Sequence, residues 1–291
     1  MNKNTINFIF FGTPDVASET LEILKKNGYV PSLIVTSPDA RSGRKMLLIP
    51  PPAKVWAEEN KIPYLQPDKF DEEFTLKLLT FDFQLFVVVA YGKIMPEKII
   101  NMPKLGSINI HYSLLPKYRG ASPVESAILN GETETGVTIQ KMVFKMDAGP
   151  IVAQEKISIL PNEKAPELRR RLKKIGAELL VKTLQTPSFF LPLNKGEVPK
   201  AVGIKQNESE ATFCKKIKKE DGLVNLEEEP PSVLYNKFRA YANWPRIFFF
   251  KNSKRIIITD AELVDRKFVI KKVLPEGKKE IKYEEFLKFN T

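Results

Sequence analysis

The chain has 291 residues, of which 43% are hydrophobic and 28% charged, and its formal net charge is +11. This length and balance fit a soluble globular protein with one large α/β domain and room for a smaller module. The single cysteine, Cys214, excludes an intramolecular disulfide and makes a poor metal ligand on its own. We therefore expect a protein of the reducing cytoplasm with no metal site.

The excess of basic residues predicts a polyanionic partner, either a nucleic acid or an anionic membrane surface. A solvated, lysine-rich surface is the alternative, because the excess is spread along the chain. The N-terminal residues predict a strand and not a signal peptide, and the apolar run at residues 85–90 is too short to span a bilayer. We therefore expect no membrane partner.

The first elements indicate a parallel sheet. Residues 5–12 are apolar and rich in β-formers, which predicts a strand buried on both faces. Residues 16–28 carry apolar side chains at helical spacing, and residues 30–38 predict a second strand. A strand, a helix and a strand in this order form a βαβ unit. Because the first turn holds only Gly12 and no GxGxxG, a dinucleotide fingerprint is excluded.

Strands and helices continue to alternate up to residue 185. Residues 39–52 are a basic, proline-terminated loop that is longer than a usual β–α connection. The following segments predict strands at 85–92, 107–111, 135–142 and 151–159 and helices at 53–63, 95–103, 123–131 and 163–185. The sequence therefore predicts an α/β domain built on an open, mostly parallel sheet.

A second domain follows a linker. Residues 187–202 lose the alternation and contain proline and lysine, and beyond them a helix is predicted at 231–245. Short β segments at 246–251, 254–263 and 267–274 predict a small barrel or half-barrel. We expect a catalytic domain at 1–188, a linker at 189–203 and a C-terminal β-barrel-like domain at 204–291.

The single histidine, His111, ends the predicted strand 107–111, two residues after Asn109. Their side chains share one face, at the sheet edge where open parallel sheets bind ligands. An amide and an imidazole can both donate hydrogen bonds to a carbonyl oxygen that becomes negative. Asp147 could fix the imidazole tautomer. With no convincing covalent nucleophile, this set predicts acid–base-assisted acyl transfer to an amine; a lone histidine with a structural role is the alternative.

Leu114, Leu115 and Pro116 follow the histidine and allow two interpretations. They could fill the domain core, or they could form an apolar floor under a flat ligand. In the second case Lys117 and Arg119 would be free to meet an acidic end of that ligand.

Three motifs in this order carry a resemblance. Asn109-x-His111, then Ser113-Leu114-Leu115-Pro116, then Asp147-x-Gly149 resemble the signature of the folate-dependent formyltransferases. The resemblance covers essentially the whole chain and extends to residues 11–17, 37–45, 50–63, 87–96 and 242–245. It implies a Rossmann-like catalytic domain and a smaller C-terminal barrel of the oligonucleotide/oligosaccharide-binding type.

The resemblance also implies a reaction. The donor would be 10-formyltetrahydrofolate and the acceptor the α-amine of methionine on initiator tRNA, with no metal required and a monomeric enzyme. The residues that match the family's catalytic set are Asn109, His111 and Asp147. Those that match its folate-binding segments are Ser113, Leu114, Leu115, Pro116, Val89, Ala90, Tyr91 and Gly92. Those that match its tRNA-contacting loop are Arg41, Arg44 and Lys45, and the C-terminal barrel would help to hold the tRNA.

Other acceptors stay open. A nucleotide-linked amino sugar is the first alternative, although the basic loop at 39–52 suits a phosphate backbone better. A purine-pathway glycinamide formyltransferase would end near residue 200, and an RNA-binding protein with an inactive site would need a blocked folate pocket.

Two departures from the family's pattern matter. Val143, Phe144, Lys145 and Ala148 change the surroundings of Asp147, and the barrel has room for roughly one strand where relatives have more.

Overall fold

The computed structural model describes residues 6–42, 46–186 and 203–288. The chain divides into two compact units, each made of several stretches of sequence. The first unit draws on residues 1–119, 136–155 and 172–211, and the second on residues 120–135, 156–171 and 212–291. The domain boundaries predicted at 188 and 204 stay predictions, and most of the predicted linker lies outside the described residues.

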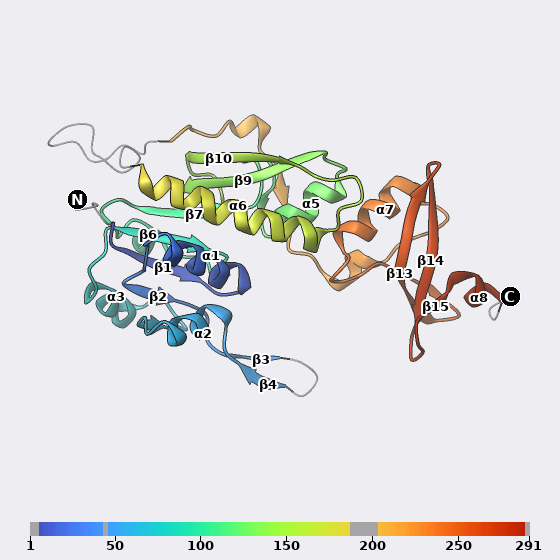
Figure 1. Cartoon of the computed structure of the whole chain (residues 1–291), viewed down its shortest axis with the longest axis horizontal. Coiled ribbons are helices and arrows are strands. Elements are labelled where there is room, and N and C mark those ends of the chain that lie inside the picture. Colours follow the sequence, from blue (N-terminus) through green and yellow to red (C-terminus); the bar gives the residue numbers. More distant parts are fainter. Residues whose placement is uncertain (1–5, 43–45, 187–202, 289–291) are drawn as a thin grey trace. The chain divides into compact units, whose positions relative to one another are not determined.

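A seven-stranded sheet forms the centre of the first unit, in the order β10-β9-β7-β6-β1-β2-β5 (Figure 1). The pairs of β1 with β2 and β6, of β2 with β5 and of β6 with β7 are parallel, and β9 is antiparallel to β7. This confirms the mostly parallel sheet. The bounds are β1 (Phe8–Gly12), β2 (Leu33–Val35), β5 (Tyr64–Leu65), β6 (Leu85–Val89), β7 (Ser107–His111), β9 (Glu134–Lys141) and β10 (Ile151–Ser158).

Helices cover both faces of this sheet (Figure 1). Lys173 of α6 bonds to Asp15 and Glu19 of α1, which places these two helices side by side on one face. On the other face, α3 and α4 pack with Ile9 and Phe11 of β1 in one apolar cluster. The bounds are α1 (Asp15–Lys26), α2 (Pro52–Glu59), α3 (Glu72–Leu79), α4 (Glu97–Ile100) and α6 (Ala165–Gln185). From β1 the strand order runs to β2 and β5 on one side and to β6 and β7 on the other. Because crossover connections are right-handed, the helices of these two halves lie on opposite faces of the sheet.

The predicted basic loop is partly a β-hairpin. β3 (Ala40–Ser42) pairs antiparallel with β4 (Leu47–Ile49), and Figure 1 shows this hairpin extending away from the sheet. The hairpin could not be predicted from the sequence because each strand has three residues, too few for a periodic pattern.

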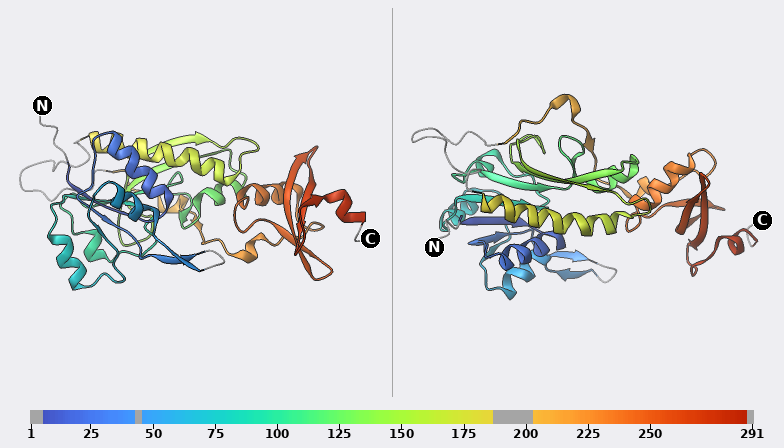
Figure 2. Two further views of the ribbon diagram at one scale, coloured as in Figure 1. Left: turned by 60° about the horizontal axis from the view of Figure 1, so that its bottom comes forward. Right: turned by 45° about the horizontal axis from the view of Figure 1, so that its top comes forward.

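The second unit contains a four-stranded antiparallel sheet in the order β12-β13-β14-β15. Figure 2 shows its long strands β13 and β14 in red. This confirms a small C-terminal β domain. A single strand, β14, occupies the part of the chain where the sequence left room for roughly one strand. Within residues 203–288 no pairing joins β12 to β15, so this sheet stays open. The bounds are β12 (Phe248–Lys251), β13 (Lys254–Val264), β14 (Lys267–Pro275) and β15 (Ile281–Lys282), with α5 (Pro123–Leu129), α7 (Pro231–Ala240) and α8 (Tyr283–Lys288).

The remaining short elements are the strands β8 (Arg119–Gly120) and β11 (Phe213–Cys214) and the 3-10 helices η2 (Glu208–Glu210) and η3 (Lys219–Gly222). Across the described part of the chain, no helix combines the length and apolarity that crossing a membrane requires.

Candidate active site

Strand β7 places two of the predicted residues on one face of the sheet. Asn109 and His111 are two residues apart, so both side chains point to the same side. The antiparallel register pairs Asn109 with Gln140 and His111 with Thr138 of β9. Four polar side chains therefore share this face, while the alternate residues of β7, Ile108 and Ile110, are buried in the core.

His111 is held by both ring nitrogens. Its side chain is buried, its Nε2 lies 2.9 Å from the carbonyl oxygen of Tyr118, and its Nδ1 lies 3.6 Å from Oδ2 of Asp147. Asp147 belongs to the connection between β9 and β10. The structure thus brings together the imidazole and carboxylate that the sequence placed 36 residues apart.

Gln140 connects Asn109 with Asp147, and the sequence did not indicate this role. Its Nε2 donates to Oδ1 of Asp147 at 2.8 Å and lies 3.4 Å from Oδ1 of Asn109. Asn109 in turn donates to the carbonyl of Val88 at 3.1 Å. Gln140 faces the site only because β9 pairs with β7 in this register, and a single sequence does not give the register.

The loop that carries Asp147, residues 142–150, has a constrained backbone. Asp147 has a φ of 49°, in the left-handed region that few non-glycine residues adopt. Two residues later, a Cβ on Gly149 would lie 1.6 Å from the carbonyl oxygen of Lys141, so no other residue fits there. The Asp-x-Gly spacing therefore reflects a tight return of the chain against β9.

The predicted folate segment at the end of β6 is partly accessible. Ala90 and Gly92 are exposed and have φ values of 48° and 83°. Tyr91 is buried, its ring packs edge-on against Phe11 at 5.5 Å, and burial raises the pKa of its phenol. The exposed backbone around Ala90 and Gly92, and not the Tyr91 ring, is thus what this segment offers to a flat heterocycle with donors and acceptors.

The Ser113–Pro116 segment divides between core and surface. Ser113 and Leu115 are buried, and the Leu115 amide donates to Oγ1 of Thr138 at 3.2 Å. Leu114 and Pro116 are partly exposed. The interpretation as a core filler therefore holds for Leu115, whereas Leu114 and Pro116 are available to a ligand.

The expectation that Arg119 meets an acidic ligand is wrong. Arg119 is 1% exposed, and its guanidinium donates to Gln206 and Glu208 within the first unit. Lys117 is exposed, as are the three residues that depart from the family's pattern before Asp147, namely Val143, Phe144 and Lys145.

Of the three predicted tRNA-contacting residues, the structure describes Arg41. Arg41 is exposed on β3, whereas Arg44 and Lys45 lie outside the described residues. Four consecutive apolar side chains follow, Met46 and the three residues of β4, and all are exposed. An exposed apolar stretch beside a cation indicates a surface that contacts a partner.

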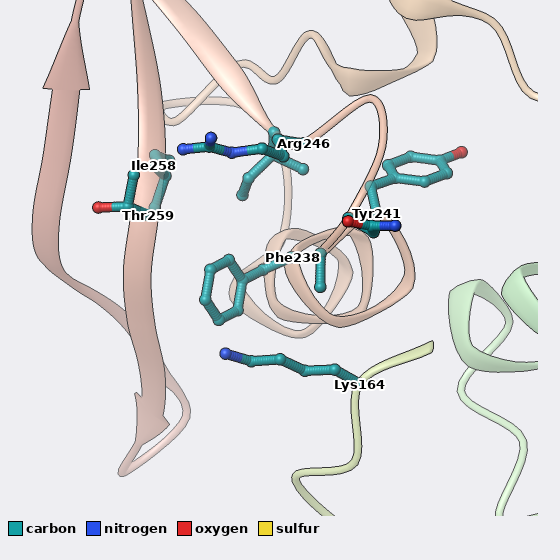
Figure 3. A pocket seen from close by; sticks show the side chains of 9 residues that line it. Lys164, Phe238, Tyr241, Arg246, Ile258 and Thr259 are labelled. Carbon is teal, nitrogen blue, oxygen red and sulfur yellow. The ribbon is translucent and has the colours of Figure 1, made fainter. Parts of the chain in front are cut away.

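The second unit has a pocket of about 250 Å³ that combines cations with an aromatic ring (Figure 3). Lys164 and Arg246 approach it from opposite sides, and Nζ of Lys164 lies 4.9 Å from the centre of the Phe238 ring. Arg246 has a φ of 66°, and its amide donates to the carbonyl of Tyr241. Cations around an aromatic face suit a phosphate with a stacked base.

Comparisons with known proteins agree over both parts of the chain. The Formyl transferase family matches residues 4–184, and the family described as Formyl transferase, C-terminal domain, matches residues 216–269. Methionyl-tRNA formyltransferase of Halalkalibacterium halodurans is 40% identical over 260 residues, which cover 89% of this chain and 79% of that protein. Methionyl-tRNA formyltransferase of Caldicellulosiruptor saccharolyticus is 37% identical over 261 residues, which cover 89% and 80%.

Solved structures of related enzymes share the fold. The N-formyltransferase of Helicobacter canadensis, in complex with folinic acid and dTDP-3-aminofucose, has a TM-score of 0.62 at 21% identity and covers 91% of this chain and 95% of that chain. A sugar N-formyltransferase of a Shewanella species has a TM-score of 0.65 at 17% identity, covering 90% and 100%. The sequence relatives are much closer than these, and the chain therefore belongs to the methionyl-tRNA formyltransferase family.

Proposed function

We propose that the protein transfers the formyl group of 10-formyltetrahydrofolate to the α-amine of methionine esterified to initiator tRNA, acting in the cytoplasm as a monomer. The observation that carries the chemistry is the meeting of Asn109, His111 and Asp147 at β7, with His111 3.6 Å from Asp147. The observation that favours tRNA as acceptor is the exposed β3–β4 hairpin with Arg41.

The reaction requires proton transfer on both sides of the formyl carbon. One bond forms between the amine nitrogen and this carbon, and one bond breaks between the carbon and the folate nitrogen. The amine loses one proton and the departing nitrogen gains one. A free α-amino group has a pKa of roughly 7.7–8.0, so the neutral amine is available near neutral pH.

The three side chains would divide this work. The Asn109 amide has two hydrogens, of which one is donated to Val88, so the second could stabilise the oxyanion. The His111–Asp147 pair would give a proton to the departing nitrogen and recover one from the amine. A positive imidazolium would also favour the negative oxygen of the tetrahedral adduct.

The folate would supply the reactive formyl carbon. The exposed backbone at Ala90 and Gly92, with Leu114 and Pro116, would hold its flat ring system. On the tRNA side, Arg41 of β3, together with Arg44 and Lys45, would contact phosphates. In the second unit, Lys164 and Arg246 beside Phe238 would do the same.

One assay tests the proposal. Purified protein is incubated with 10-formyltetrahydrofolate and charged initiator tRNA, and N-formylmethionine is measured. A nucleotide-linked amino sugar is the competing acceptor in a parallel reaction. We expect formylation of methionyl-tRNA to be faster; faster formylation of the sugar, with indifference to tRNA, would overturn the proposed acceptor.

A further inference from the structure

Residues 203–210 belong to the first unit and lie against the loop of Asp147. Ile204 forms two backbone hydrogen bonds with Ile151 at the start of β10, each of 2.8 Å. Of residues 203–210, all of which the structure describes, Gln206 alone is buried. Gln206 is therefore the side chain of this segment that is enclosed by the first unit, while the exposed Glu208 reaches inward to Arg119.

Gln206 binds the backbone on both sides of Ala148. Its Nε2 donates to the carbonyl of Asp147 at 2.9 Å and to the carbonyl of Gly149 at 2.6 Å. Two hydrogen bonds from one rigid amide fix the relative orientation of these two peptide groups. They therefore restrict the backbone angles at Ala148 and the direction in which the Asp147 side chain projects from the backbone.

Arg119 fixes the Gln206 amide in turn. Oε1 of Gln206 accepts from Nε of Arg119 at 3.0 Å and from Nη2 at 2.8 Å. The charge of this buried arginine is paired with Glu208, which accepts from Nη1 and Nη2 at 3.1 and 2.9 Å. A buried guanidinium whose donors are used in this way holds its acceptors in one geometry. The amide of Gln206 therefore cannot rotate without breaking the bonds to Arg119.

Asp147 needs such support. At a φ of 49° its backbone is in the left-handed region, which an L-residue adopts at a cost in free energy and keeps only when the surroundings hold it. The same residue presents its carboxylate to Gln140 and His111. If the backbone relaxed to negative φ, the carboxylate would turn away from the imidazole.

We propose that Gln206, held by Arg119, is a positioning residue that keeps the Asp147 carboxylate against His111. The inference rests on the proposed role of Asp147 in proton transfer. Gln206 would not touch the substrates; it would act through the backbone of Asp147 and Gly149.

The test is Gln206→Glu in the full chain. A glutamate keeps an acceptor for Arg119 and so keeps the buried charge paired, but it has no hydrogens to donate to the two carbonyls. We expect kcat to fall about 10- to 100-fold with KM for methionyl-tRNA changed less than about two-fold, because misplacing a catalytic group by about 1 Å has effects of this size. Gln206→Met, which adds no charge, should give the same loss in kcat.

Two controls separate positioning from general damage. Gln84→Glu makes the same chemical change on an exposed side chain that precedes β6, and it should leave kcat unchanged. In an Asp147→Asn background, Gln206→Glu should cost little further activity, because the group it positions is already disabled.

The outcomes are distinct. If wild type formylates methionyl-tRNA and both Gln206 variants keep its kcat, the inference is overturned and the proposed function stands. A full additive loss in the Asp147→Asn background would also overturn it. A wild type that formylates no methionyl-tRNA would instead overturn the proposed function.

Discussion

Nε2 of His111 lies 2.9 Å from the carbonyl oxygen of Tyr118. A carbonyl oxygen can only accept, so this nitrogen carries a hydrogen. Nδ1, on the other side of the ring, faces Oδ2 of the Asp147 carboxylate at 3.6 Å. The proton transfer proposed for His111 would therefore take place on the Nδ1 side of the ring, because Nε2 is occupied by the Tyr118 carbonyl.

This geometry predicts a specific result for His111→Gln. The glutamine amide can replace Nε2 as the donor to Tyr118, so the melting temperature should stay near that of wild type. It cannot replace Nδ1, so kcat should fall by roughly 10²–10³, as expected when a proton-transfer group is lost. Steady-state kinetics beside a thermal melt measure both effects. A variant that kept more than about half of the activity would show that His111 is not part of the reacting site.

Asp147→Asn should be comparably damaging. The asparagine retains an oxygen that can accept from Gln140, so the loop should keep its position. An amide cannot accept a proton as a carboxylate can, so kcat should fall by about 10² or more with folate affinity little changed. Folate titration and circular dichroism check that binding and fold are intact. Equal losses in kcat and in folate affinity would point to a binding role instead.

The sequence predicted the elements with strong periodicity and the chemistry they carry. Strand β1 and helix α1 have clear patterns, and the Asn-x-His spacing at the end of β7 placed two side chains on one face. Gln140 could not be predicted, because it reaches Asp147 only through the register between β7 and β9. Gln206 could not be predicted either, because it lies 59 residues from Asp147 in the sequence and meets it only in the folded chain. The burial of Arg119 could not be predicted, because arginine is rarely fully buried unless its charge is paired, as it is here by hydrogen bonds to Glu208 and Gln206.

Leu115 and Leu114 should respond differently to truncation. Leu115 is 3% exposed, so Leu115→Ala should lower the free energy of unfolding by about 2–5 kcal/mol, with folate affinity little changed once the protein is folded. Leu114 is partly exposed, so Leu114→Ala should cost less stability and weaken folate binding more. Chemical denaturation and folate titration of the two variants make a matched pair. The same pattern in both would contradict the division between core and ligand surface.

Glu208 should make stability sensitive to acid. Hydrogen bonds from Arg119 and then Lys145 lower the pKa of Glu208 to about 2 from its ordinary value of 4.5. Because the pKa of this carboxyl is lower in the folded protein, its ionised form stabilises the fold. The stabilisation is fully present above about pH 4.5 and is lost as the pH falls toward 2. The difference in melting temperature between wild type and Glu208→Gln should therefore be present at neutral pH and shrink below about pH 4. A difference independent of pH would contradict the ion pair.

The pocket of Lys164 and Arg246 makes a prediction about salt. Nucleic-acid binding releases counterions, so log K for tRNA should fall linearly with log salt, with a slope of roughly −0.7 to −0.9 per phosphate contact. If Arg246 and Lys164 each meet a phosphate, Arg246→Ala and Lys164→Ala should each make the slope shallower by about one unit. Folate affinity should not change, because the folate residues lie elsewhere in the chain.

The control is Lys77→Ala, which removes an exposed cation of α3 that pairs with Glu73 in the first unit. It lowers the net charge by the same amount as the pocket variants, so it reports the general effect of charge. Binding is measured by fluorescence anisotropy with initiator tRNA at several salt concentrations. If Arg246→Ala and Lys77→Ala shift the slope equally, the pocket has no specific phosphate contact. The tRNA would then be bound by the β3–β4 hairpin, and Arg41→Ala should make the slope shallower.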